Sequence, residues 1–335
     1  MILDLRELAD GSRLEADLCI VGSGPAGITI ARRFAHGARR VVVLESGGLE
    51  PEREAQELNR GEVRGERYFD LRLPRQRAFG GTSAHWNGAM GQLGAADFAP
   101  RPWLAAPGWP IDLEEVTAHY PEALEICGGG AWPRERSRDA RTFTRDPMPP
   151  GGASWLEVRH RQQSTSGPRR FGRHFRRPLA ASRAVRVVLH ANVTELLAAP
   201  GGEHVEAVAV RTVEGRRATV SARAFVLACG GLENPRLLLL SDGVVAGGLG
   251  NRHDQVGRCF QEHPITSLGE YFGVGAQLSA LSTLSGSPRL LRDLCPEGGF
   301  AVDERCLQFG VELAPRQEPR WRPERATPHG EPPFV

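Results

Sequence analysis

Residues 17–34 decide the fold of this chain, and they read DLCIVGSGPAGITIARRF. The apolar run at residues 18–21 is short, as expected for a buried strand, and it ends at a Gly-x-Gly-x-x-Gly motif. Beyond the motif, Ile28, Ala31 and Phe34 recur at helical spacing. The stretch therefore predicts a strand, a tight glycine turn and a helix.

Each glycine of this turn has a physical task. Gly22 permits the tight turn, Gly24 lets the backbone approach a pyrophosphate, and Gly27 lets the helix pack closely on the strand. Pro25 suits the first helical turn, because its missing N–H would be unpaired there anyway. Unpaired N–H groups and the positive end of the helix dipole favour an anion at this place. The motif alone fits a plain packing turn equally well.

A second apolar strand at residues 41–44 ends on Glu45. The interval from Gly27 to Glu45 is close to the roughly 20 residues that separate turn and acid in dinucleotide-binding folds. A carboxylate here can accept hydrogen bonds from ribose hydroxyls. It would repel the 2′-phosphate of NADP, although Arg39 and Arg40 nearby weaken this second argument. The alternative for Glu45 is a solvated strand end.

The composition limits the size of the core and the classes of partner that the chain can bind. With 335 residues, of which 40% are apolar, the chain can bury one large or two moderate cores. A net charge of +2 gives no nucleic-acid footprint, and no apolar run reaches the roughly 20 residues of a membrane span. The six cysteines form no C-x-x-C pair, so no metal site is predicted. The N-terminal residues lack the pattern of a signal peptide, so we expect a cytoplasmic location.

A second glycine-rich stretch, residues 79–91, holds one imidazole and one indole ring. Its glycines allow the backbone to lie against a flat or charged ligand, while Thr82, Ser83 and Asn87 offer hydrogen-bonding groups. His85 is its only titratable residue. With this stretch the chain resembles the glucose–methanol–choline (GMC) flavoprotein oxidoreductases, whose second glycine-rich signature lies below the isoalloxazine and pyrophosphate of FAD.

The resemblance continues through residues 97–111 and looks like the bacterial branch that handles sugars and related alcohols. In some sugar oxidases similar to that branch, a histidine before a tryptophan in this loop is joined covalently to the flavin methyl group. His85 and Trp86 match that pattern. Covalent attachment, noncovalent contact with the flavin and a structural role all stay open for His85.

The middle of the chain mixes polar segments with predicted strands. Val116, Tyr120 and Leu124 share a face and predict one helix over residues 113–126. Residues 131–180 are expected to form a polar linker or crossover, with a surface helix or a flank of the cofactor cleft in their arginine-rich part. We expect the strands that follow to form a small antiparallel layer. These strands are residues 185–190, 192–196, 205–213 and 217–226.

Residues 225–238 form a third signature, an apolar strand that ends in small residues and starts a new helix. Ala228 and Gly230 resemble the small residues that pass over the FAD ribose and pyrophosphate in flavoproteins, and the strand with Val193 is expected to pass the adenine. A plain strand-to-helix turn is the alternative. At His263 a structural or pocket-wall role is favoured over acid–base chemistry. The predicted cofactor-binding residues are Gly22, Gly24, Pro25, Ala26, Gly27, Glu45, Ser46, Gly80, Gly81, Thr82, Ser83, His85, Asn87, Gly88, Ala89, Met90, Val193, Ala228, Gly230 and Asn234.

The resemblance covers residues 1–265, which we expect to form an α/β, Rossmann-like FAD-binding domain with a parallel sheet. Residues 266–335 are expected to be an incomplete α+β substrate domain with a proline-rich, disordered tail. The family's catalytic histidine and its histidine or asparagine partner lie near the C-terminus, and no stretch here matches them. His329 lies in the proline-rich tail and does not receive that role. The chain therefore resembles a truncated member with unassigned catalytic residues.

The resemblance implies oxidation of an alcohol or sugar hydroxyl, with a base taking the proton and FAD accepting the hydride. The electron acceptor is left unidentified. One alternative is an FAD-binding fragment or subunit that lacks its own catalytic pair. A second is an NAD-dependent reductase. The second and third signatures speak against it, because no other Gly-x-Gly-x-x-Gly begins a strand–helix unit.

Overall fold

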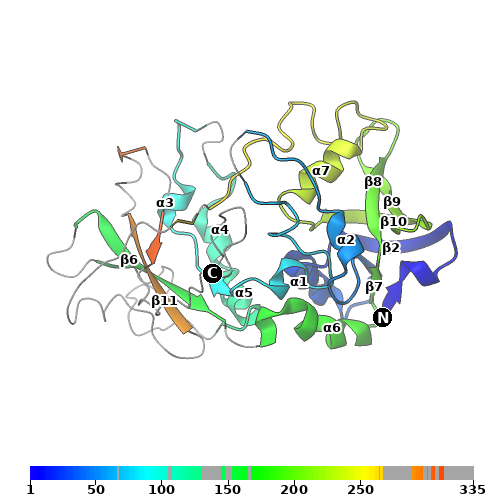
Figure 1. Ribbon diagram of the computed structural model, residues 1–335, viewed down its shortest axis with the longest axis horizontal. Helices are drawn as coiled ribbons and strands as arrows, with labels where there is room; N and C mark the ends of the chain where they lie inside the picture. Colours follow the sequence, from blue (N-terminus) through cyan, green and yellow to red (C-terminus); the bar gives the residue numbers. More distant parts are fainter. Residues whose placement is uncertain are drawn as a thin grey trace, which may run out of the picture.

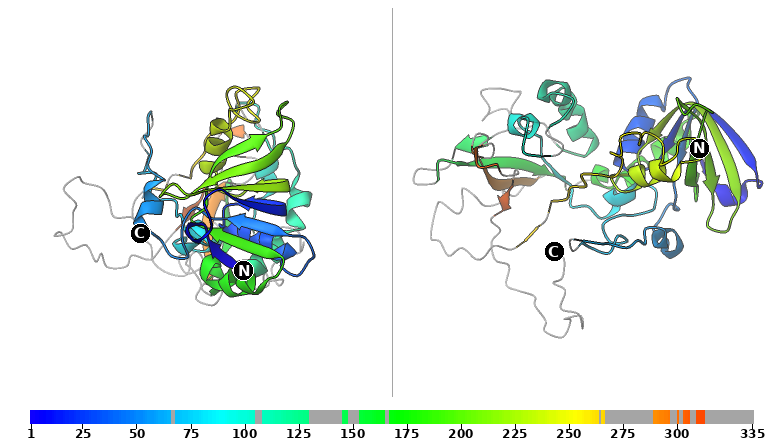
Figure 2. Two further views of the ribbon diagram at one scale, coloured as in Figure 1. Left: turned by 90° about the vertical axis from the view of Figure 1, so that its right-hand side faces the viewer. Right: turned by 90° about the horizontal axis from the view of Figure 1, so that it is seen from above.

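The structure is a computed structural model in which two β-sheets stand at opposite ends of the long axis (Figure 1). Figure 2 shows the same separation from above. The residues that the structure describes are 1–65, 68–104, 108–129, 145–147, 153–164, 167–263, 265–266, 289–296, 300, 303–305 and 309–312. The predicted tail with His329 lies outside them.

The larger sheet has seven strands in the order β1-β7-β3-β2-β10-β9-β8. Its strands are β1 (Ile2–Asp4), β2 (Ser12–Val21), β3 (Val41–Leu44), β7 (Val185–Leu189), β8 (Asn192–Ala198), β9 (Val205–Arg211) and β10 (Arg217–Leu227). Neighbours from β1 to β10 in this order run parallel, whereas β8 and β9 are antiparallel. The parallel part is the Rossmann-like sheet that the first strand, turn and helix predict.

Side chains of the central strands pack alternately into two cores, because a strand alternates its side chains between the two faces of a sheet. The helices that cover the sheet are α1 (Pro25–Phe34), α6 (Phe171–Ala181) and α7 (Glu233–Leu240). Ile20 and Val43 lie in the core that includes α1 and α6. Val21 and Leu44 lie in the other core with Leu237 of α7, and Figure 1 shows α6 and α7 on opposite sides of the sheet. All of β3 is buried, as expected for a parallel strand covered on both faces.

All four strands predicted between residues 185 and 226 are present, but one of them has a different place. β7 lies between β1 and β3 in the parallel part, outside the expected antiparallel layer. Four of its five residues are buried, so it needs cover on both faces. β8, β9 and the first half of β10 form the antiparallel part, which is hydrogen bonded into the same sheet.

Within the described residues, the smaller sheet has five strands, in the order β12-β11-β6-β4 with β5 beside β6. They are β4 (Ala89–Met90), β5 (Arg145–Pro147), β6 (Leu156–Gln163), β11 (Arg289–Pro296) and β12 (Val311–Glu312). The expected linker or crossover at residues 131–180 thus contains β5, β6 and α6, and α6 leads directly into β7. The smaller sheet also takes strands from both sides of the expected domain boundary at residue 265, because β11 pairs with β6 along eight residues.

The single helix predicted over residues 113–126 is wrong. Two helices occupy the range, α4 (Leu113–Thr117) and α5 (Tyr120–Ile126). Pro121 explains the break, because a proline lacks an N–H and its ring clashes with the carbonyl four residues earlier, here that of Thr117. The described residues also form the short α-helices α2 (Arg53–Glu57) and α3 (Ala95–Phe98). No helix in the described part of the chain combines the length and the apolar character needed to cross a membrane.

Candidate functional site

A cavity of about 720 Å³ lies at the carboxyl ends of the parallel strands β2, β3 and β10. Val21, Leu44 and Leu227, the last residues of these strands, form part of its wall. Open parallel sheets bind their ligands at this edge, and the volume is typical of a small-molecule site. The predicted cofactor-binding residues that line the cavity are Gly22, Gly24, Pro25, Ala26, Glu45, Ser46, Gly81, Thr82, Val193, Ala228, Gly230 and Asn234.

The first glycine turn is tightly packed at two of its glycines. A Cβ added at Gly22, whose φ is +101°, would lie 2.6 Å from the carbonyl oxygen of Ala228. A Cβ added at Gly27 would lie 2.0 Å from the carbonyl oxygen of Gly22. Both contacts are with backbone that cannot swing aside, so the turn needs glycine at these positions. Gly27 is buried beneath the turn and does not line the cavity.

The cavity side of the site is bare backbone. A Cβ added at Gly24 would meet no atom of the described residues within 4 Å, and the same holds at Gly230 and Gly231. All three glycines line the cavity. A Cβ at any of them would therefore enter space that a ligand can use, and the main chain is open to direct contact with it.

Helix α1 begins at this bare backbone. Gly24 is its N-cap residue and Pro25 its first residue, and no side chain in the described part of the chain caps this end. The free N–H groups and the dipole of this ten-residue helix are suited to an anion such as a diphosphate. The residues present therefore fit the diphosphate part of a dinucleotide.

Glu45 follows β3 and is buried, with 5% of its surface exposed. Its carboxylate accepts hydrogen bonds from the Ser23 N–H (3.1 Å), the Ser23 hydroxyl (2.5 Å) and the Gly47 N–H (3.0 Å). Burial raises the pKa of Glu45, and these hydrogen bonds oppose the increase. Because a carboxylate offers about four acceptor positions, about one remains for a ribose hydroxyl. Glu45 thus ties the first glycine turn to the end of β3, and its contact with ribose stays a prediction.

The beginning of the second glycine-rich stretch contacts the first glycine turn. The Gly80 N–H donates to the carbonyl oxygen of Ser23 (3.0 Å), and a 3-10 helix, η2 (Gly81–Ala84), follows. Ser83 is buried in this helix; its hydroxyl donates to the Gly80 carbonyl (2.6 Å) and accepts from the Phe171 N–H (3.2 Å). The hydroxyl is therefore engaged within the protein, while Gly81 and Thr82 face the cavity.

The later part of this stretch leads away from the cavity to the smaller sheet. The Trp86 indole N–H donates to the carbonyl oxygen of Arg169 (2.6 Å), and β4 pairs with β6. The Asn87 side chain accepts a hydrogen bond from the Ala89 N–H (2.8 Å). The predicted site residues that do not line the cavity are Gly27, Gly80, Ser83, His85, Asn87, Gly88, Ala89 and Met90. His85 is exposed, and its role toward the flavin stays a prediction.

The third signature forms a turn that Asn234 holds together. The Asn234 side chain accepts from the Cys229 N–H (2.9 Å) and donates to the Leu227 carbonyl (3.3 Å). The Ala228 N–H donates to the carbonyl oxygen of Val21 (2.7 Å), which joins this turn to the strand of the first signature. Burial raises the pKa of Cys229 to about 12, so its thiol is protonated at neutral pH and unreactive.

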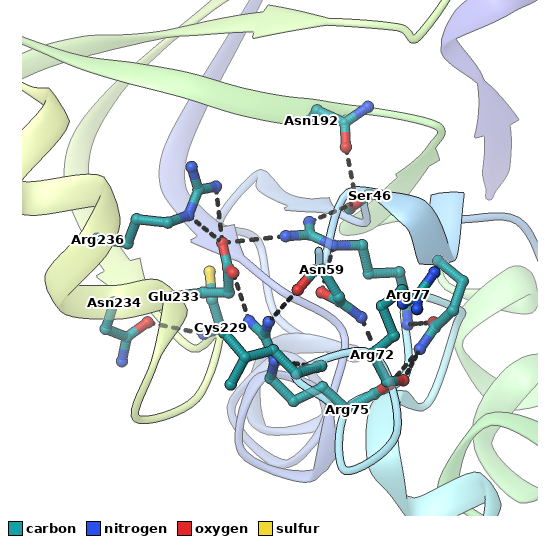
Figure 3. Close-up of polar contacts among 12 residues, drawn as sticks. Ser46, Asn59, Arg72, Arg75, Arg77, Asn192, Cys229, Glu233, Asn234 and Arg236 are labelled. Carbon is teal, nitrogen blue, oxygen red and sulfur yellow. Dashed lines mark hydrogen bonds and ion pairs between the residues drawn. The ribbon is translucent and has the colours of Figure 1, made fainter. Parts of the chain in front are cut away.

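Sequence reasoning missed a charged network in the cavity wall (Figure 3). Arg75, Arg77 and Arg236 all contact the carboxylate of Glu233, and all four residues line the cavity. Burial opposes ionisation of Glu233, but the hydrogen bond from Arg236 and the charge of Arg77 lower its pKa overall. Glu233 and Arg236 lie in the third signature, so their position could have been found there. Arg75 and Arg77 lie in a stretch with no motif.

Neither of the two described histidines that the sequence singled out, His85 and His263, lines the cavity. His263 is 90% exposed and contacts Glu262 through Nδ1 (2.7 Å), while His85 lies beyond the cavity wall. In the described part of the chain, no group of histidine, cysteine, aspartate and glutamate side chains is arranged to hold a metal ion.

Comparison with known proteins shows which protein family this chain resembles. Residues 152–265 match the family model described as GMC oxidoreductase. Two proteins of Mycobacterium tuberculosis, from strains CDC 1551 / Oshkosh and H37Rv, are each 30% identical over 283 residues, which is 77% of this chain and 43% of the relative. Both are described as uncharacterized GMC-type oxidoreductases. These matches confirm the resemblance of the chain to the GMC oxidoreductases.

Two solved structures of the family are also similar to the chain. A formate oxidase is 19% identical, with a TM-score of 0.46, and the matched region covers 70% of this chain and 48% of the formate oxidase chain. Pyridoxine 4-oxidase from Mesorbium loti is 22% identical with a TM-score of 0.43, covering 68% of this chain and 52% of its own. This chain spans less than half the length of the curated relatives it matches.

Similarity to this family confirms several predictions made from the sequence. The GMC oxidoreductases are FAD-dependent, which confirms the resemblance, the Rossmann-like α/β fold and FAD as the cofactor. The alternative of an NAD-dependent reductase finds no support.

Proposed function

We propose that this chain supplies the FAD-binding part of an oxidoreductase that oxidises a hydroxyl group of an alcohol or sugar. The bare backbone of Gly24, Gly230 and Gly231 carries the proposal, because it faces one cavity at the carboxyl ends of the parallel strands. Such a surface suits a dinucleotide. Similarity to the GMC oxidoreductases supports the redox chemistry. A cytoplasmic location is part of the same proposal.

Each part of the cavity wall has a proposed partner in the cofactor. The backbone at Gly24 and the N-terminus of α1 would hold the diphosphate. Glu45 would accept a hydrogen bond from ribose, and Val193 would lie against the adenine. Gly81 and Thr82 would lie on the flavin side. Bound FAD supplies a hydride acceptor for the hydroxyl-bearing carbon.

A second candidate is an FAD-binding protein that does not turn over a substrate by itself. It is supported by the positions of His85 and His263, which do not line the cavity, so no base for the hydroxyl proton is assigned among the described residues. Loss of a general base slows such reactions by about 10²–10⁴-fold. Under this candidate a partner would supply the missing base.

Turnover separates the two candidates. The purified full chain, loaded with FAD, would be incubated with primary alcohols and aldoses and with an artificial electron acceptor whose reduction is followed by absorbance. Reduction that depends on both the substrate and the bound FAD supports the first candidate. A loaded protein that reduces no acceptor with any of these substrates contradicts it and favours the second.

A further inference from the structure

One stretch of the cavity wall is held by side chains that come from distant parts of the sequence. We call residues 68–77 the wall segment; it lines the cavity through Tyr68 and residues 74–77. Within the segment, the Leu73 N–H donates a hydrogen bond to the Asp70 carbonyl (2.9 Å), which closes a turn. It belongs to no helix or strand.

Glu233 joins the wall segment to helix α7. Its two carboxylate oxygens contact different arginines, Arg75 Nη1 at 2.5 Å and Arg77 Nη2 at 3.0 Å. Figure 3 shows both guanidinium groups converging on this one carboxylate. Arg236 of the same helix contacts Glu233 at 2.7 Å and supports its orientation from the other side. Helix α7 and the wall segment are about 160 residues apart in the sequence, so this contact exists only in the folded chain.

The two arginines also reach other parts of the wall. Arg75 donates to the carbonyl oxygen of Asn59 (2.8 Å), and Arg77 donates to the Asn59 side chain (2.7 Å) and to the Ser46 hydroxyl (2.8 Å). Ser46 directly follows Glu45 at the edge of the sheet. Both arginines are therefore held in position by the carboxylate of Glu233 on one side and by uncharged acceptors on the other.

The far end of the wall segment has a second, weaker attachment. The Tyr68 hydroxyl donates to Glu262 (2.7 Å), and the Tyr68 ring meets the ring of Phe260 edge to face at 5.6 Å. Burial raises the pKa of Tyr68 to about 12, with Glu262 acting in the same direction, so the hydroxyl stays protonated and can donate. Phe260 and Glu262 line the same cavity.

We propose that Glu233 is a positioning residue that fastens the wall segment across the cavity through Arg75 and Arg77, and thereby slows the release of the bound dinucleotide. That the bound dinucleotide is FAD rests on the proposed function. Glu233 acts on the cofactor through the two arginines and takes no part in the chemistry at the flavin.

Burial explains why these ion pairs can fasten the segment. The side chains of Arg75, Arg77 and Glu233 are 18%, 13% and 14% exposed. Arg72 of the same segment pairs with Glu57 of α2 at 3.0 Å, but these side chains are 39% and 46% exposed. Exposed pairs contribute little to stability, whereas removing one partner of a buried pair leaves a buried charge without a countercharge. Glu57 is therefore the matched control for Glu233.

The test measures the rate of FAD release and the access of a protease to the wall segment. FAD-loaded full chain is diluted, and the recovery of flavin fluorescence gives the release rate. We expect Glu233→Gln to release FAD at least about tenfold faster than the wild type, and Glu57→Gln to match the wild type. Arg75→Gln should also speed release, whereas Arg75→Lys, which keeps a charge for Glu233, should stay closer to the wild type.

Limited digestion with trypsin, which cleaves after arginine, reports on the wall segment without any cofactor. In apoprotein, cleavage after Arg72, Arg75 and Arg77, located by mass spectrometry, should be faster in Glu233→Gln than in Glu57→Gln. Equal release rates, or equal cleavage rates, would overturn the proposal. A wild-type chain that binds no FAD would refute the proposed function alone, and the digestion would then decide on the fastening. If Glu233→Gln does not fold, both measurements are made on Arg75→Gln and Arg75→Lys instead. Faster release and faster cleavage in Arg75→Gln than in Arg75→Lys support the proposal, and equal rates overturn it.

Discussion

Gly24 and Gly27 belong to one motif, yet their α-carbons have opposite surroundings. An added Cβ at Gly24 would meet open cavity, while one at Gly27 would lie 2.0 Å from the Gly22 carbonyl oxygen. Gly27 is thus required by packing between helix and strand, and Gly24 is available to a ligand. The structure separates these two tasks for this chain.

Substitution of these two glycines by alanine should separate folding from binding. Gly27→Ala should lower the free energy of unfolding by about 1–3 kcal/mol, because backbone must shift to admit the methyl group. Gly24→Ala should leave that free energy nearly unchanged and weaken FAD binding. Denaturant unfolding and flavin-fluorescence titration measure the two effects. Normal FAD affinity in Gly24→Ala would contradict the assignment of the diphosphate to this backbone.

Glu45 should make stability depend on pH in a definite direction. Its folded pKa is raised by burial, so above the ordinary glutamate value of about 4.3 the unfolded state loses its proton first. The stability contributed by protonated Glu45 is therefore lost as the pH rises from that value to the raised folded pKa. Urea unfolding of the apoprotein across this pH range should show the loss in the wild type and not in Glu45→Gln. The same dependence of the unfolding free energy on pH in both proteins would refute this prediction.

At the scale of elements, the long excursion between β3 and β7 has a structural role beyond connection. It contributes β4, β5 and β6 to the smaller sheet and α6 to a core of the larger one. Phe171 at the start of α6 is 1% exposed and packs against Trp86 of the second glycine stretch. Helix α6 therefore connects the core of the sheet to the loop that leaves the cavity.

Truncating Phe171 should measure how much α6 stabilises the fold. Phe171→Ala removes a buried ring and should cost about 3–5 kcal/mol of unfolding free energy. Arg177→Ala, on the exposed face of the same helix, should change it by less than about 0.5 kcal/mol. Equal small effects in thermal or denaturant unfolding would mean that α6 is only a peripheral connection.

For the whole molecule, the sequence predicted what local patterns encode. The glycine turn, the buried run of β3 and the third signature are each continuous in sequence, so the Rossmann-like sheet and its ligand edge could be inferred. The pairing of β11 with β6 could not, because it joins strands about 130 residues apart that carry no shared pattern. Arg75 and Arg77 were missed for the same reason. In an arginine-rich chain, only the fold distinguishes an arginine held by Glu233 from a solvated one.

The central claim is that the cavity at the ends of β2, β3 and β10 holds FAD. The most direct test is the visible absorption spectrum of the full chain after incubation with FAD and removal of the unbound cofactor, recorded before and after acid precipitation. We predict flavin bands in the folded protein and their absence in Gly24→Glu, where a carboxylate would occupy the diphosphate position. Colour in the precipitate would assign a covalent link, to be checked with His85→Ala, and colour in the supernatant a noncovalent one. A wild-type protein that stays colourless after incubation with FAD would contradict the assignment of FAD to this cavity.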